Sequence, residues 1–191
     1  TLQVLDYAIL VISGTDGVQA HTRTLWRLLQ KRGIPTFLFI NKMDLAGADR
    51  EAVLRQPQTT LDAGCLDFGG GLAPLQEDLA SLDEGLMERY LSGGTVTAAD
   101  AAQLIARRQV FPCYFGSALK LEGVDALLEG LAQYALTPSY PADFAARVFK
   151  IARDGSERLT YLKVTGGSLK VRTLLSGGGG EAGWEEEVNQ V

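Results

Sequence analysis

The chain has 191 residues, of which 46% are hydrophobic and 21% are charged, proportions typical of a soluble globular protein. They exclude a disordered tail and a collagen-like repeat. The formal net charge of −5 disfavours a dedicated nucleic-acid surface, so no DNA partner is expected. The longest apolar runs, at 7–12 and 37–40, fall far short of the roughly 20 residues that span a bilayer, so no membrane partner is expected either.

The first 45 residues read as strand, helix, strand. Residues 7–12 form a continuous apolar run, which suits an interior parallel strand covered by helices on both faces. A turn at 13–17 and a helix over 18–32 follow, and residues 34–40 predict a second buried strand. This spacing indicates a right-handed crossover unit of an α/β fold. If earlier strands are missing, the sheet is expected to expose an apolar edge.

Residues 48–109 predict a helical insertion. Leucines at helical spacing indicate one helix over 75–91, and the segment 59–71 reads as a glycine-containing loop. Thr97 and Asp100 have the spacing of a capping box at the start of a further helix. A third apolar strand is expected at 110–115, and then a helix over 124–136.

Beyond residue 137 the pattern changes from helical to alternating. Residues 138–143 are predicted to be a linker, because closely spaced prolines cannot continue a helix. Short strands joined by turns then indicate the start of an antiparallel β-barrel, incomplete within 144–191. They are expected at 146–151, 159–164, 169–174 and 184–191. The predicted organisation is an α/β domain portion over 1–137, the linker, and this partial barrel.

The cysteines and the histidine give no sign of metal or covalent chemistry. Cys65 and Cys113 lie far apart without a Cys-x-x-Cys spacing, so no disulfide framework or metal site is expected, and a reducing cytoplasm is the favoured location. Cys65 is expected to be a loop thiol and Cys113 a buried strand thiol. His21, the sole histidine, is expected to be an ordinary surface or packing residue. No catalytic residue is assigned.

Two polar tetrapeptides follow neighbouring predicted strands. Asn41-Lys42-Met43-Asp44 comes directly after the second strand, and Gly116-Ser117-Ala118-Leu119 after the third. Ligands bind at the carboxyl ends of parallel strands, so both loops are expected at one site. The Asp44 carboxylate would accept the N1–H and N2 amine of guanine. The Asn41 amide and the Ala118 N–H would donate to O6 and N7, and the stem of Lys42 would cover the base.

A phosphate-binding loop is absent from these residues. The sequence contains no Gly-x-x-x-x-Gly-Lys-[Ser/Thr] motif and no Gly-Lys pair. The chain therefore carries only the half of a nucleotide site that reads the base.

Several segments resemble elongation factor G and its relatives, above all the tetracycline-resistance ribosomal protection proteins. The resemblance covers almost the whole chain and is weakest at 54–75. The segments that carry it include Leu5–Ile12, Gly33–Asp44, Met87–Gly93, Phe111–Ala118, Val148–Ile151 and Gly166–Lys170.

This resemblance implies a cytoplasmic translational GTPase that acts on the ribosome, with a P-loop-type G domain followed by a β-barrel domain. It assigns guanine recognition to Asn41, Lys42 and Asp44, and a supporting role to Ser117 and Ala118. It also implies that the ligand is GTP or GDP and that the phosphate loop lies upstream. Mg²⁺ would then bind only when that upstream segment is present. Leu119 departs from the Lys found there in many GTPases. The chain alone is expected not to hydrolyse GTP.

Two interpretations of function remain open at this point. One is a fragment of a ribosomal GTPase. The other is a non-enzymatic module that binds a ribosome or another partner and retains nucleotide loops as relics. The sequence does not distinguish tetracycline protection from a role in elongation or release, nor does it give the oligomeric state.

Overall fold

A computed structural model describes residues 2–177 and 183–188. They divide into two compact units, one formed essentially by residues up to Thr137 and the other by Pro138 onward. The first contains β1 (Ala8–Ser13), α1 (Ala20–Lys31), β2 (Thr36–Asn41), α2 (Arg50–Thr60), β3 (Cys65–Asp67), α3 (Gln76–Ala80), α4 (Glu84–Leu91), α5 (Ala98–Ala106), β4 (Phe111–Phe115) and α6 (Val124–Tyr134), with 3₁₀ turns η1 (Leu2–Val4) and η2 (Ala73–Leu75). The α/β class expected from the sequence is confirmed.

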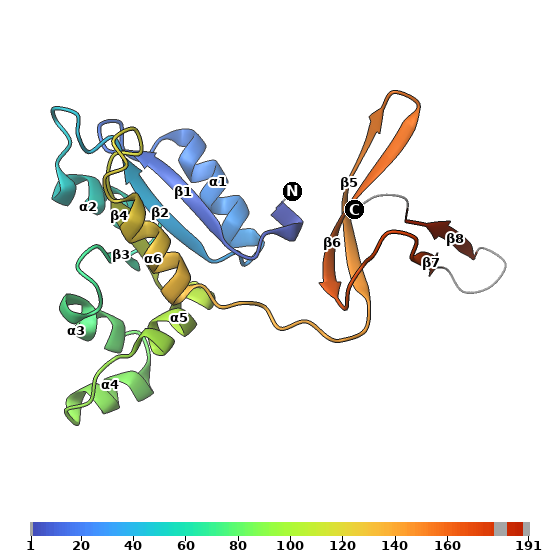
Figure 1. Cartoon of the computed structure of the whole chain (residues 1–191). Helices are drawn as coiled ribbons and strands as arrows, with labels where there is room; N and C mark the ends of the chain where they lie inside the picture. The colour runs from blue at the N-terminus through green and yellow to red at the C-terminus, as the bar shows by residue number, and fades with distance from the viewer. Residues whose placement is uncertain (1, 178–182, 189–191) are drawn as a thin grey trace. The chain divides into compact units, whose positions relative to one another are not determined.

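The first unit is built on a four-stranded parallel sheet of order β1-β2-β4-β3, with helices on both sides (Figure 1). Successive β2 side chains point to opposite faces. Phe37 and Phe39 enter a core with α3, α5 and α6, whereas Leu38 and Ile40 enter a second core with α1 and α2. Because both faces of β2 are buried, its central residues 37–40 are all apolar.

The strand β1 differs from its expectation as an interior strand covered on both faces. It lies at an edge of the described sheet. Leu10 and Ile12 are buried against the core that contains Trp26, but Ile9 and Val11 on the opposite face are 46% and 56% exposed. Two apolar side chains of this edge strand are therefore partly exposed on one face of the described sheet.

The helical insertion also differs in two places. Residues 65–67 form the short strand β3, which pairs with β4, where the sequence indicated only a loop. The single helix expected over 75–91 is divided into α3 and α4. The break falls at Ser81–Asp83, where the Ser81 hydroxyl donates to the Asp78 carbonyl and the Asp83 carboxylate accepts from the Leu86 N–H. Such short polar side chains compete with the helix and favour a restart.

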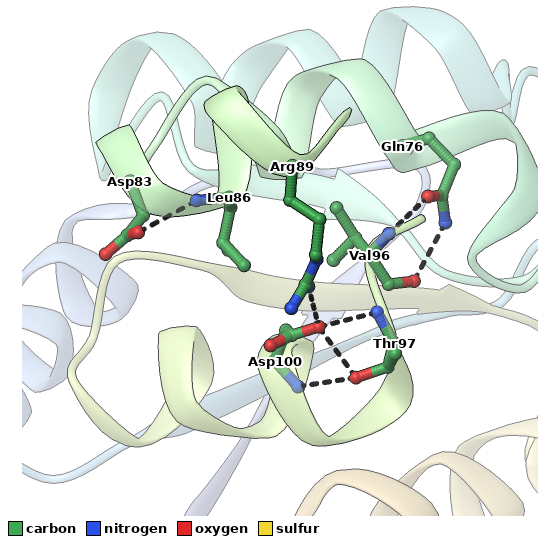
Figure 2. A network of polar contacts seen from close by, with 7 residues as sticks. All are labelled: Gln76, Asp83, Leu86, Arg89, Val96, Thr97 and Asp100. Atoms are coloured by element: carbon green, nitrogen blue, oxygen red, sulfur yellow. Dashed lines mark hydrogen bonds and ion pairs between the residues drawn. The ribbon is translucent and has the colours of Figure 1, made fainter. Parts of the chain in front are cut away.

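Polar contacts hold the helices of the insertion together (Figure 2). The amide of Gln76 clamps the backbone of Val96, accepting from its N–H at 2.6 Å and donating to its carbonyl at 3.1 Å. The expected capping box between Thr97 and Asp100 is present at the start of α5, and Arg89 of α4 forms an ion pair with the same carboxylate. Burial alone would raise the pKa of Asp100, but hydrogen bonds from Thr97 and the Arg89 charge outweigh it and lower that pKa.

The second unit consists of two antiparallel pairs. β5 (Ala145–Asp154) pairs with β6 (Glu157–Gly166), and β7 (Leu174–Gly177) pairs with β8 (Trp184–Glu187). The strand predicted over 169–174 is wrong except at Leu174, because turn and irregular residues occupy 167–173 and β7 begins only at Leu174. The predicted end of the last strand, 189–191, lies outside the described residues. Gly166 is the one buried position among the described residues of this unit.

No helix among the described residues is both long and apolar enough to cross a membrane. The described residues also contain no cluster of three or more His, Cys, Asp or Glu side chains with the arrangement of a metal site.

Candidate functional site

The two loops singled out by sequence lie beside each other at the carboxyl end of the sheet. β2 and β4 are adjacent and parallel, with Ile40 in register with Phe115, so the chain leaves both strands at the same edge. Backbone hydrogen bonds then join the loops: the Gly116 N–H donates to the Ile40 carbonyl at 2.9 Å, and the Met43 N–H donates to the Gly116 carbonyl at 3.0 Å. The sheet therefore brings the predicted site residues together.

Asn41 connects the loops through its side chain. Its Oδ1 accepts from the backbone N–H of Lys42 at 2.8 Å and from that of Ala118 at 2.9 Å. Both partners are N–H donors, so the amide oxygen is fixed toward them and its Nδ2 is the group left to act as a donor. The Ala118 N–H, expected to face a base, thus has an acceptor within the protein.

Lys42 adopts a left-handed backbone conformation, with φ of 66°. Such a conformation costs a residue other than glycine about 1–3 kcal/mol and persists only where surrounding contacts impose it. Those contacts are the bonds of Asn41 to Lys42 and Ala118 on one side and the bond of Met43 to Gly116 on the other. The Lys42 side chain itself is exposed.

Asp44 is the carboxylate of the site. Its side chain is only 13% exposed, and Lys120 Nζ lies 3.3 Å from its Oδ2. Ser117 is the largest influence on the pKa of Asp44 and lowers it; burial raises that pKa, and with the further contributions of Lys120 and the backbone the net effect is a lowered pKa. Asp44 is therefore ionised at neutral pH, the form in which both oxygens accept hydrogen bonds.

Ser117 is almost completely buried, at 1% exposure. It closes the tight turn 117–122, in which the Ser117 N–H donates to the Glu122 carbonyl at 2.9 Å and the Glu122 N–H donates back at 3.0 Å. Gly116 permits this turn, because a Cβ there would lie 1.9 Å from the Glu122 carbonyl oxygen. Ala118 and Leu119 lie at the exposed tip, and Leu119 is 91% exposed.

Arg50 supports the neighbouring part of this edge. Its guanidinium donates two hydrogen bonds of 2.8 Å to the Asp67 carboxylate, at the end of β3. It also lies 4.4 Å from the centre of the Phe115 ring, at the end of β4. The start of α2 is thereby tied to both strand ends.

The remaining candidates lie elsewhere. Cys65 is fully buried in β3, so its expectation as a loop thiol is wrong, whereas Cys113 is the buried strand thiol that was expected. Burial raises the pKa of the Cys113 thiol, which opposes its reactivity. His21 is exposed on α1. Lys120 was not among the site residues predicted from the sequence; its signal was a cation three residues after Ser117, in the turn that follows β4.

The fold and the paired loops define the class of this domain. Residues 1–137 match the family model described as the elongation factor Tu GTP binding domain, and the chain belongs to that family.

Among individual relatives, the chain is 36% identical to the oxytetracycline resistance protein of Streptomyces rimosus, over 92% of this chain and 31% of that one. It is 35% identical to the tetracycline resistance protein TetW of Butyrivibrio fibrisolvens, over 95% of this chain and 31% of that one. The expected resemblance to such proteins is confirmed, and the chain spans about three tenths of their length.

A crystal structure of a protein from Thermus thermophilus has the same fold. It superposes with a TM-score of 0.80 at 23% sequence identity, and the match covers 98% of this chain and 35% of that one. The agreement extends over both units as a fold and carries no conclusion about activity.

Proposed function

We propose that Asn41, Lys42, Asp44, Ser117 and Ala118 form the guanine-recognition half of a GTP/GDP site. The observation that carries the proposal is the Asp44 carboxylate, which has a lowered pKa, lies 3.3 Å from Lys120 Nζ of the adjacent loop and keeps 13% of its side chain exposed to solvent. Membership of the elongation factor Tu GTP-binding family supports it.

The roles follow from the donors and acceptors of guanine. Its N1–H and N2 amine are adjacent donors, and one carboxylate accepts both. Adenine offers an acceptor at N1, and leaving such groups unpaired costs about 1–3 kcal/mol each. Asn41 Nδ2 is the donor that remains for N7 or O6, since its Oδ1 is bonded within the protein. The exposed stem of Lys42 would lie against one face of the base.

The sequence contains no phosphate-binding loop that would hold the phosphates of the nucleotide. Phosphoryl transfer depends on positioning and charge neutralisation by a phosphate loop and Mg²⁺, and the Gly-x-x-x-x-Gly-Lys motif does not occur in these 191 residues. We therefore propose that the chain by itself binds nucleotide weakly and does not hydrolyse GTP. In a longer protein that also carries the phosphate loop, these residues would confer guanine specificity on a GTPase.

The cellular role of that longer protein is also proposed from its relatives. Relatives that share this region are named for resistance to tetracyclines. We propose that the longer protein is a cytoplasmic GTPase of the ribosomal-protection type, which engages the ribosome. This proposal explains both the match to the GTP-binding family and the similarity to the tetracycline resistance proteins. A non-enzymatic ribosome- or partner-binding module with relic loops is the alternative, and it predicts that the site shows no preference for guanine.

An exchange at Asp44 tests the proposal. Xanthine carries a carbonyl where guanine carries its N2 amine, so Asp44→Asn should lose GDP binding and gain binding of xanthosine diphosphate, because the amide offers the matching donor. Affinities would be measured from amide chemical shifts of Lys42 and Ala118 at millimolar nucleotide. Asp125→Asn on exposed α6 is the matched control and should behave as the parent chain. Unaltered preference in Asp44→Asn would contradict the assignment.

A further inference from the structure

The contact between Lys120 and Asp44 bears on how a base enters the site. Lys120 Nζ lies 3.3 Å from Asp44 Oδ2, and the side chains are 52% and 13% exposed respectively. The lysine therefore lies on the solvent side of a carboxylate that is otherwise mostly enclosed by protein. On the protein side, Ser117 is the largest of the influences that lower the pKa of that carboxylate.

The backbone around Lys120 is fixed, whereas its side chain is long. The Lys120 N–H donates to the Ser117 carbonyl at 3.1 Å, and the turn is closed by the paired bonds between Ser117 and Glu122. The ion pair contributes little, because solvent reaches the half-exposed lysine and screens its charge, and holding a lysine in one conformation costs entropy. The ammonium can thus leave Asp44 without any change in the turn.

We infer that Lys120 pairs with the Asp44 carboxylate and competes with guanine for it. This inference rests on the proposed function, because it requires Asp44 to accept the N1–H and N2 amine. Those donors approach from solvent, where the ammonium lies. Lys120 is thereby an affinity-determining residue that keeps the Asp44 charge paired until a base with two adjacent donors replaces it.

The competition predicts a gain of affinity when the lysine is removed. Lys120→Met keeps most of the aliphatic stem and should bind GDP about two- to fivefold more tightly than the parent chain at low salt, the range expected for an exposed ion pair. High salt screens the pair in the parent chain, so the advantage of the variant should shrink at 500 mM NaCl (~3–5 Å screening length). Both affinities come from the amide shifts of Lys42 and Ala118.

Two controls separate this inference from the proposed function. Lys31→Met, on the exposed end of α1, makes the same change in charge and should match the parent chain. ADP, titrated into all three proteins, should bind more weakly than GDP. Preference for GDP with equal or weaker binding by Lys120→Met would overturn the role of Lys120 alone. Equal binding of GDP and ADP by all three would overturn the proposed function, and the role of Lys120 with it.

Discussion

The two units of the chain use similar apolar side chains with opposite results. In the first, Ile12, Ile40 and Ile105 are at most 2% exposed, because helices cover both faces of β2 and β4. In the second, Ile151 and Val148 of β5 are 60% and 49% exposed, and Trp184 of β8 is 51% exposed. Apolar residues thus occur in the strands of both units, but a core forms only where a second layer lies over the sheet.

The same contrast holds for the loops. In the first unit, the loops at 41–44 and 116–120 are fixed by side-chain and backbone bonds to each other. In the second, the turn between β5 and β6 joins a hairpin whose residues are mostly exposed. A rigid layered scaffold is what allows an irregular segment to hold donors and acceptors in fixed positions.

The largest expected effect comes from a matched pair of isoleucines. Ile105→Ala removes a fully buried side chain from α5 and should cost about 2–5 kcal/mol of unfolding free energy, whereas Ile151→Ala should change it by less than about 0.5 kcal/mol. Urea unfolding of the first unit would be followed by the fluorescence of Trp26 in a Trp184→Phe background, and that of the second unit by the fluorescence of Trp184 in a Trp26→Phe background. Equal costs would contradict the contrast between the units.

A smaller effect is expected where the two site loops meet. Gly116→Ala places a Cβ 1.9 Å from the Glu122 carbonyl oxygen and should destabilise the first unit by about 1–3 kcal/mol. It should also shift the amide signal of Met43, whose N–H donates to the Gly116 carbonyl. Gly70→Ala, where the nearest atom would be 3.5 Å away, is the control and should change neither stability nor that signal.

The smallest effect concerns the Asp100 network and its pH dependence. The folded-state pKa of Asp100 is lowered, so its contribution to stability is present above the unfolded pKa of about 3.9 and is lost as the pH falls through the folded value. Asp100→Asn should therefore cost about 1 kcal/mol at pH 7, and the difference from the parent chain should shrink as the pH falls below the unfolded pKa of about 3.9. Urea unfolding at several pH values checks this, and a constant difference would argue against it.

Local sequence patterns were enough to predict most of the helices and strands of the first unit. The apolar run of β2, the Thr97–Asp100 capping box and the glycine-terminated α1 are each determined by neighbouring residues, and each was predicted close to its position. The adjacency of the site loops followed from the rule that parallel strands end at one edge.

What the sequence did not predict depends on long-range contacts. The strand β3 has only three residues and exists through its pairing with β4. The exposure of Ile9 and Val11 depends on which layers are present, not on their alternation. Likewise, the position of Lys120 against Asp44 is set by a turn whose closure no local pattern revealed.

The central claim is that the loops beside β2 and β4 read guanine. The most direct test is an amide chemical-shift titration of the chain with GDP and, separately, with ADP, at equal concentrations so that the phosphate contribution is shared. The account predicts that GDP shifts the signals of Lys42, Asp44 and Ala118 more than ADP does and leaves Leu159 in β6 unaffected. Equal shifts with both nucleotides, or shifts confined to other residues, would contradict it.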